Sequence, residues 1–202
     1  IEVKGGQKNI SERKFFPSLE EGRGYLKDFD YLPISMEILY DASTLVNIFL
    51  CLQDSHENAF LLESVENGDK WGRYSFVAYD PKEKIEVRGE EIRITDESGE
   101  KLLTNVNPLD YISNILLTNT SPKIEGASRF TGGYLGYFSY DTVRYVEKTL
   151  VNIPEDDLKI PDILLFKCTE IIAFDHLTHK LHITINIPTK GDYEHNYKAG
   201  ME

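Results

Sequence analysis

The residues best suited to binding chemistry are Glu63 and Ser64, which lie side by side within an otherwise apolar run. The neighbours at 60–62 are Phe, Leu and Leu, and Val65 follows. This pattern is typical of a buried strand, so it predicts a carboxylate and a hydroxyl in the protein interior. Because burying an unpaired carboxylate costs on the order of several kcal/mol, Glu63 is expected to contact a cation, an N–H group or a ligand.

A candidate cation, Arg73, occurs in the strand that is expected to follow. Asn-Gly-Asp at 67–69 is typical of a turn, and the aromatic run at 71–79 is typical of a strand. The two runs predict a hairpin that carries ionisable groups of both signs. On these residues alone, a structural salt bridge between Glu63 and Arg73 is the simpler interpretation, and a ligand is the alternative partner.

The whole string LLESVENGDKWGRYSF, at 61–76, closely resembles the N-terminal part of anthranilate synthase component I. An LLES strand followed by a GRYSF strand is a hallmark of that family. The resemblance continues in PSLEE and LPISMEI within 17–38 and in RFTGGYLGYFSYD at 129–141. It covers nearly the whole chain from about Phe16 onward, but only the N-terminal portion of the family.

The resemblance implies an allosteric pocket for L-tryptophan, to which Leu62, Glu63 and Ser64 contribute. Glu63 would face the ammonium group of the amino acid, and Leu62 would pack against the indole. Arg73 would then be the internal partner of Glu63, a residue that supports the pocket from behind, or an exposed strand position.

The resemblance also implies the reaction of the parent enzyme, a lyase that converts chorismate and glutamine-derived ammonia to anthranilate and pyruvate in the first step of tryptophan biosynthesis. Its chorismate and Mg²⁺ sites are expected in a second, larger region, whose acidic and glycine-rich motifs do not occur in these 202 residues. No catalytic residue, metal ligand or cofactor is therefore expected here, and the fragment alone should be inactive. The implied partners are L-tryptophan, the glutamine amidotransferase component II and the C-terminal chorismate-binding domain.

Two alternatives to this assignment remain open. Aminodeoxychorismate synthase component I shares the fold, although the string at 61–76 favours the anthranilate enzyme. A stand-alone domain that senses an amino acid is the other alternative, and tryptophan binding by the isolated chain would favour it.

Composition excludes some other classes of function. The net charge is −12 and the basic residues form no run, which argues against a nucleic-acid interface. No apolar stretch reaches the length of a membrane span, and the N-terminus lacks a signal-peptide core. A cytoplasmic protein that binds neither nucleic acid nor membrane is expected.

The cysteines and histidines give no sign of a metal site. Cys51 and Cys168 have apolar neighbours and no metal-ligand spacing, so both are expected to be buried free thiols. His176, His179 and His182 cluster around an expected turn, and metal binding there is the less favoured interpretation.

Periodicity and turn residues predict an α+β fold, a largely antiparallel sheet assembly with outer helices, in one sheet or two packed sheets. Residues 1–16 are expected to be a weakly ordered arm, 17–189 the domain, and 190–202 the start of a helix leading to the absent chorismate-binding domain. Helices are expected at 19–27, at 44–53 with Ser43 as its cap, and at 108–118; strands are expected at 32–40, 60–65, 71–79, 84–88, 91–95, 101–106, 162–174 and 180–188.

A glycine-rich segment at 129–141 could suggest a phosphate-binding loop. The spacing of Gly132, Gly133 and Gly136 matches neither known phosphate motif, however. Glycine alternating with aromatic residues instead predicts a closely packed strand. By resemblance this strand lies in the sheet core near the regulatory pocket, and apolar surface is expected on its side of the fragment.

Overall fold

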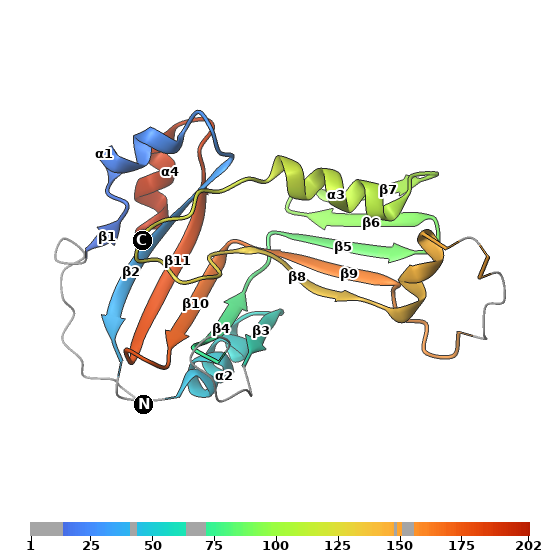
Figure 1. Cartoon of the computed structure of the whole chain (residues 1–202), viewed down its shortest axis with the longest axis horizontal. Coiled ribbons are helices and arrows are strands. Elements are labelled where there is room, and N and C mark those ends of the chain that lie inside the picture. Colours follow the sequence, from blue (N-terminus) through green and yellow to red (C-terminus); the bar gives the residue numbers. More distant parts are fainter. Residues whose placement is uncertain (1–13, 41–43, 64–71, 148, 151–155) are drawn as a thin grey trace.

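The chain folds around two antiparallel sheets, and its helices lie outside them (Figure 1). The predicted α+β class is confirmed, and of the two arrangements that the sequence leaves open the chain adopts two sheets. The computed structural model describes residues 14–40, 44–63, 72–147, 149–150 and 156–202. The first sheet contains, in spatial order, β1 (Phe15–Phe16), β2 (Tyr31–Leu39), β11 (Lys180–Pro188), β10 (Glu170–Asp175), β4 (Tyr74–Tyr79) and β3 (Ala59–Leu62). The second contains β7 (Gly99–Thr104), β6 (Glu91–Asp96), β5 (Glu83–Arg88), β9 (Ile163–Cys168) and β8 (Gly133–Phe138).

The apolar run at 162–174 forms two strands in different sheets, so the prediction of one long strand is wrong. β9 pairs with β5 and β8, whereas β10 pairs with β4 and β11. The chain changes sheets at Thr169, whose carbonyl accepts hydrogen bonds from the backbone N–H of Asn186 (2.8 Å) and from its side-chain amide (3.2 Å). Both halves of the run are buried, so the apolar pattern continues through the break.

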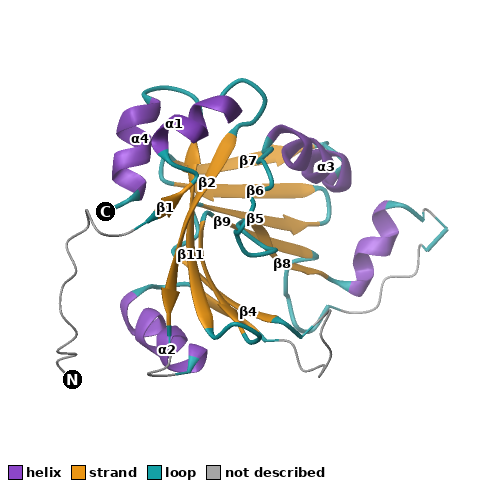
Figure 2. Cartoon of the chain, turned by 60° about the vertical axis from the view of Figure 1, so that its left-hand side comes forward, coloured by secondary structure: helices purple, strands orange, loops and turns teal. Residues whose placement is uncertain are grey.

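The helices lie on the outer faces of the sheets (Figure 2). α1 (Leu19–Gly22) and α4 (Tyr193–Gly200) lie together at one end of the first sheet, α2 (Leu45–Ser55) lies at its other end, and α3 (Pro108–Thr118) accompanies the second sheet. Within the described residues, no helix is both long enough and apolar enough to cross a membrane.

Local capping explains where the helices begin. Ser18 and Glu21 form the predicted capping box, but α1 ends early and continues as a 3₁₀ turn at Arg23–Tyr25. Thr44 caps α2 in place of the predicted cap Ser43, which lies outside the described residues. Asn107 caps α3, and the predicted bounds of that helix are confirmed.

The glycine-rich strand β8 confirms the packing interpretation but not the expected position. A Cβ atom at Gly136 would lie 1.8 Å from the carbonyl oxygen of Leu164, so β8 approaches β9 too closely for any side chain at that position. β8 is nevertheless the outermost strand of the second sheet, with β9 as its neighbour. Apolar side chains beyond its end, at Tyr140 and Val146, are 93% and 72% exposed.

Candidate functional site

Leu62 and Glu63, two of the three predicted binding residues, lie at the open end of an edge strand. β3 pairs with β4 through Leu62 and Phe76, and the strand ends at Leu62. The Leu62 side chain is 41% exposed and Glu63 is exposed, so the prediction of a buried carboxylate is wrong. Ser64 lies outside the described residues. The burial of Glu63 was predicted from the apolar pattern around it, and that pattern is the same for a central strand and for a four-residue edge strand that is open on one side.

Arg73 binds Asp175 rather than Glu63. Its Nη2 atom lies 2.6 Å from Asp175 Oδ2, and its Nε atom lies 3.0 Å from Oδ1. The Asp175 side chain is 2% exposed, whereas that of Arg73 is 38% exposed. Within the described part of the chain, no hydrogen bond or ion pair engages the Glu63 carboxylate.

Asp175 also organises the turn between β10 and β11. Its Oδ1 atom accepts hydrogen bonds from the backbone N–H groups of Leu177 (2.9 Å) and Thr178 (3.4 Å). Burial raises the pKa of Asp175, but the hydrogen bonds from Arg73 and from this turn outweigh burial and hold the pKa well below its ordinary value. The carboxylate therefore remains charged at neutral pH and fixes the position of Arg73.

A buried histidine lies on the same face of the first sheet. His182 is 4% exposed, its ring packs edge-on against Tyr74, and its Nδ1 atom has no hydrogen-bond partner among the described residues. The nearest carboxylate oxygen recorded is Glu37 Oε1 at 3.8 Å. Burial lowers the pKa of His182, so the ring is neutral at pH 7.

The other histidines and the cysteines have separate surroundings. His176 shares a hydrogen bond with the Ser75 hydroxyl (2.8 Å), and His179 packs against Phe174. The described residues contain no group of three or more His, Cys, Asp or Glu side chains arranged to hold a metal. Cys168 is buried, and burial raises its pKa to about 12. Cys51 is exposed, contrary to the prediction.

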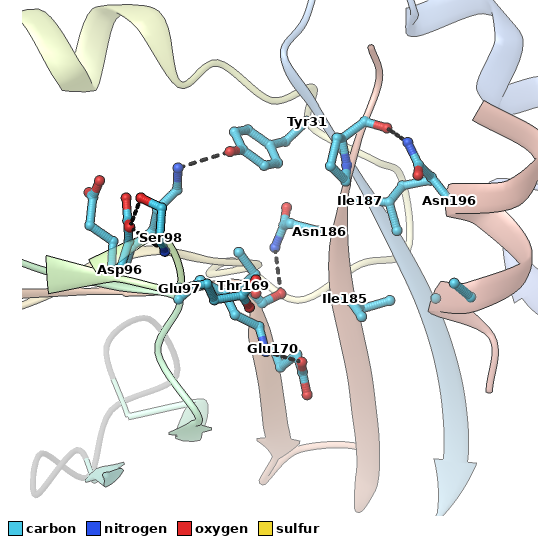
Figure 3. A pocket seen from close by; sticks show the side chains of 16 residues that line it. Tyr31, Asp96, Glu97, Ser98, Thr169, Glu170, Ile185, Asn186, Ile187 and Asn196 are labelled. Atoms are coloured by element: carbon cyan, nitrogen blue, oxygen red, sulfur yellow. Dashed lines mark hydrogen bonds and ion pairs between the residues drawn. The ribbon is translucent and has the colours of Figure 1, made fainter. Parts of the chain in front are cut away.

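A pocket that the sequence does not predict lies where the two sheets meet (Figure 3). Its volume is about 640 Å³. Its walls come from the start of β2, the end of β11, α4, the β9–β10 junction, the β4–β5 turn and the β6–β7 turn. We call it the inter-sheet pocket. No short motif could have predicted it, because its residues come from six separate segments.

Comparisons with known proteins connect the chain to one enzyme subunit. No family model matches the sequence. Anthranilate synthase component 1 of Acetivibrio thermocellus is 34% identical over 188 residues, which is 93% of this chain and 38% of that protein. The component 1 protein of Pseudomonas aeruginosa is 38% identical over 176 residues, 86% of this chain and 35% of that protein. The chloroplastic anthranilate synthase alpha subunit 2 of Arabidopsis thaliana is 34% identical over 84% of this chain and 30% of that protein.

A solved structure shares the fold. The crystal structure of anthranilate synthase component I from Streptococcus pneumoniae superimposes with a TM-score of 0.52 at 21% sequence identity, over 80% of this chain and 34% of that one. The chain therefore spans little more than a third of the length of its first relatives.

Proposed function

We propose that this chain is the regulatory and structural N-terminal portion of an anthranilate synthase component I. The premise is that the chain is related to that subunit over most of its own length. The complete enzyme would be a lyase that forms anthranilate and pyruvate from chorismate and glutamine-derived ammonia. Chorismate and Mg²⁺ would bind in a further region, and component II would supply the ammonia. The reported relatives favour this function over aminodeoxychorismate synthase component I and over a stand-alone sensor.

The regulatory part of the proposal is feedback by L-tryptophan at the end of β3. The observation that carries it is the free carboxylate of Glu63, exposed at an open sheet edge beside the half-exposed Leu62. Glu63 would bind the ammonium group of tryptophan, Leu62 would pack on the indole, and Ser64 would hydrogen-bond the ligand or position the strand. Arg73 supports this edge through Asp175 and does not neutralise Glu63.

Tryptophan could inhibit only by binding one arrangement of the two regions more tightly than another. The effect should therefore be tested in the complete component I that contains this chain. Anthranilate formation would be followed by its fluorescence, with chorismate, ammonium and Mg²⁺ supplied, over a range of L-tryptophan concentrations.

The decisive variant is Glu63→Gln, and its matched control is Glu57→Gln, an exposed glutamate just before β3. A charge-assisted contact is worth about 1.5–3 kcal/mol, so Glu63→Gln should raise the inhibitory concentration of tryptophan by at least ~10-fold. Glu57→Gln should leave it unchanged. Equal inhibition of both variants and the parent enzyme would refute the assignment of Glu63.

A further inference from the structure

The first sheet contains a buried histidine that the proposed feedback site does not use. We propose that His182 on β11 is a pH switch: its ring is neutral in the folded protein near pH 7, and its protonation loosens the packing of β11 against β2 and β4. Of the five histidines in the chain, His182 is the one whose side chain is buried, at 4% exposure. The inference rests on the surroundings of this ring and does not require the proposed function.

The strand register places the His182 ring among three other strands. His182 is the direct partner of Glu37 on β2 and of Ala173 on β10. Its ring packs edge-on against Tyr74 of β4, with 6.3 Å between the ring centres. Since β10 lies between β11 and β4, the small side chain of Ala173 leaves the two rings room to meet across it. A change in the charge of the ring therefore affects several strands at once.

One nitrogen of the ring has no acceptor or donor within reach. The Nδ1 atom of His182 is buried and has no hydrogen-bond partner among the described residues. Glu37 Oε1, at 3.8 Å, is beyond hydrogen-bond distance. A neutral imidazole has one N–H donor, whereas an imidazolium has two. Protonation would therefore place a charged donor in the interior without an acceptor, which is unfavourable.

The charges around the ring are already paired with one another. Charged or titratable side chains face it from every neighbouring strand: Glu37 on β2, Arg73 just before β4, Tyr74 on β4, Asp175 on β10 and Lys180 on β11. Glu37 binds Lys180 (2.8 Å), and Asp175 binds Arg73 (2.6 Å). Burial lowers the pKa of His182, and within each pair the attraction of the carboxylate is offset by repulsion from the cation.

Protonation of His182 must therefore be accommodated by movement. The imidazolium gains a partner if Nδ1 approaches Glu37, in competition with Lys180, or if the ring turns out to water. Either movement takes the ring away from Tyr74. A histidine whose pKa is lowered by folding stabilises the protein above its unfolded pKa of about 6.5. That contribution is lost as the pH falls through the lower folded pKa, so the switch acts below about pH 6.5.

Proton NMR titration of the unaltered chain tests the switch directly. The imidazole signal of His182, assigned by its loss in His182→Gln or by triple-resonance NMR, should titrate with a midpoint below 6.5. Glu37→Gln should lower the midpoint further because it removes the nearest carboxylate. Lys180→Met should raise it because it removes a neighbouring positive charge. A midpoint at or above 6.5, or one that neither variant moves, would overturn the inference.

Urea unfolding measures whether this proton is linked to folding. Between pH 7 and 5 the equilibrium constant for unfolding of the parent should rise by at least ~3-fold. This range lies above the one in which the carboxylates of Asp175 and Asp30 are protonated. His182→Gln should lose the rise, and the control His179→Gln, whose side chain is exposed, should keep it. An equal rise in the parent and in His182→Gln would refute the switch. If His182→Gln fails to fold, the NMR titrations of the other proteins decide.

Hydrogen exchange shows where the switch acts. After correction for the intrinsic pH dependence of exchange, the backbone amides of β2 and β11 should exchange at least ~3-fold faster at pH 5.5 than at pH 7. The amides of β5 and β6, in the second sheet, serve as the internal control and should show no change. Faster exchange in both sheets alike, or in neither, would show that protonation of His182 does not loosen the first sheet.

Discussion

Arg73 and Asp175 form an ion pair in which two guanidinium nitrogens contact both carboxylate oxygens, at 2.6–3.2 Å. The pair joins the residue before β4 to the last residue of β10, next to the edge where β3 ends. The carboxylate is almost fully buried, whereas the guanidinium is partly exposed and lies 5.0 Å from the centre of the Tyr74 ring. This contact explains why the arginine of the GRYSF string is unavailable to Glu63.

Removal of the Asp175 charge should destabilise the protein. Asp175→Asn leaves Arg73 unpaired and weakens the β10–β11 turn, which should lower the free energy of unfolding by ~1–3 kcal/mol. The value is below that of a fully buried pair because water screens the exposed side of Arg73. Urea unfolding measures it, and Glu100→Gln, which breaks the exposed pair with Arg93, is the control with an expected effect below ~1 kcal/mol. Equal decreases in the free energy of unfolding of the two variants would show that the Asp175 carboxylate contributes no more than an exposed ion pair.

Acid should weaken the fold through the same carboxylate. A carboxyl group whose pKa is lowered by folding stabilises the protein above its unfolded pKa and loses that contribution as the pH falls through its folded pKa. Folding lowers the pKa of Asp175 from 3.8, and hydrogen bonds from Lys190 and Thr120 lower that of Asp30 to about 2. Urea unfolding at pH 7 to 2 should therefore show stability falling below about pH 4, and Asp175→Asn should show a smaller fall. Parallel curves for the two proteins would exclude Asp175 as a source of the acid sensitivity.

The proposed inhibition of the complete component I by tryptophan should respond to a bulky side chain at position 64. Ser64→Phe introduces a ring directly after Glu63, so the ratio of anthranilate formation with and without L-tryptophan should rise toward one. The control Ser55→Phe lies at the exposed end of α2 and should leave the ratio unchanged. Full inhibition of Ser64→Phe would remove Ser64 from the proposed pocket.

The close approach of β8 and β9 should make Gly136 intolerant of a side chain. Gly136→Ala places a methyl group 1.8 Å from the carbonyl oxygen of Leu164, so the strands must separate, at a cost of ~1–3 kcal/mol or more. Gly24→Ala has no atom within 4 Å of the added Cβ and serves as the control in urea unfolding. A Gly136→Ala protein as stable as the parent would show that β8 can shift without loss.

Local chemistry explains which elements could be predicted from sequence. The Asn107-Pro108 start defines α3, and the Gly-Glu turn at 89–90 defines the β5–β6 hairpin. In each case the residues that determine the element lie within it or beside it. The turn predicted at 98–99 lies one residue too late, because Gly99 already pairs with Asp96, and β7 therefore begins before the predicted strand at 101–106.

Long-range relationships explain what could not be predicted. The change of sheet at Thr169 depends on which strands lie beside each half of an apolar run. The exposure of Glu63 depends on β3 being an edge strand, and the choice of Asp175 by Arg73 depends on the pairing of β4 with β10. Periodicity alone does not determine how the predicted strands divide between two sheets.

The change of sheet at Thr169 also sets an order of events during synthesis. The second sheet, β5 to β9, is inserted in the sequence between β4 and β10 of the first sheet. A chain that emerges from the ribosome can therefore complete the second sheet at Cys168, while β2 and β4 still await their central partners β11 and β10. The first sheet begins earlier and finishes later, so its apolar strands are the part of the nascent chain most in need of protection from aggregation.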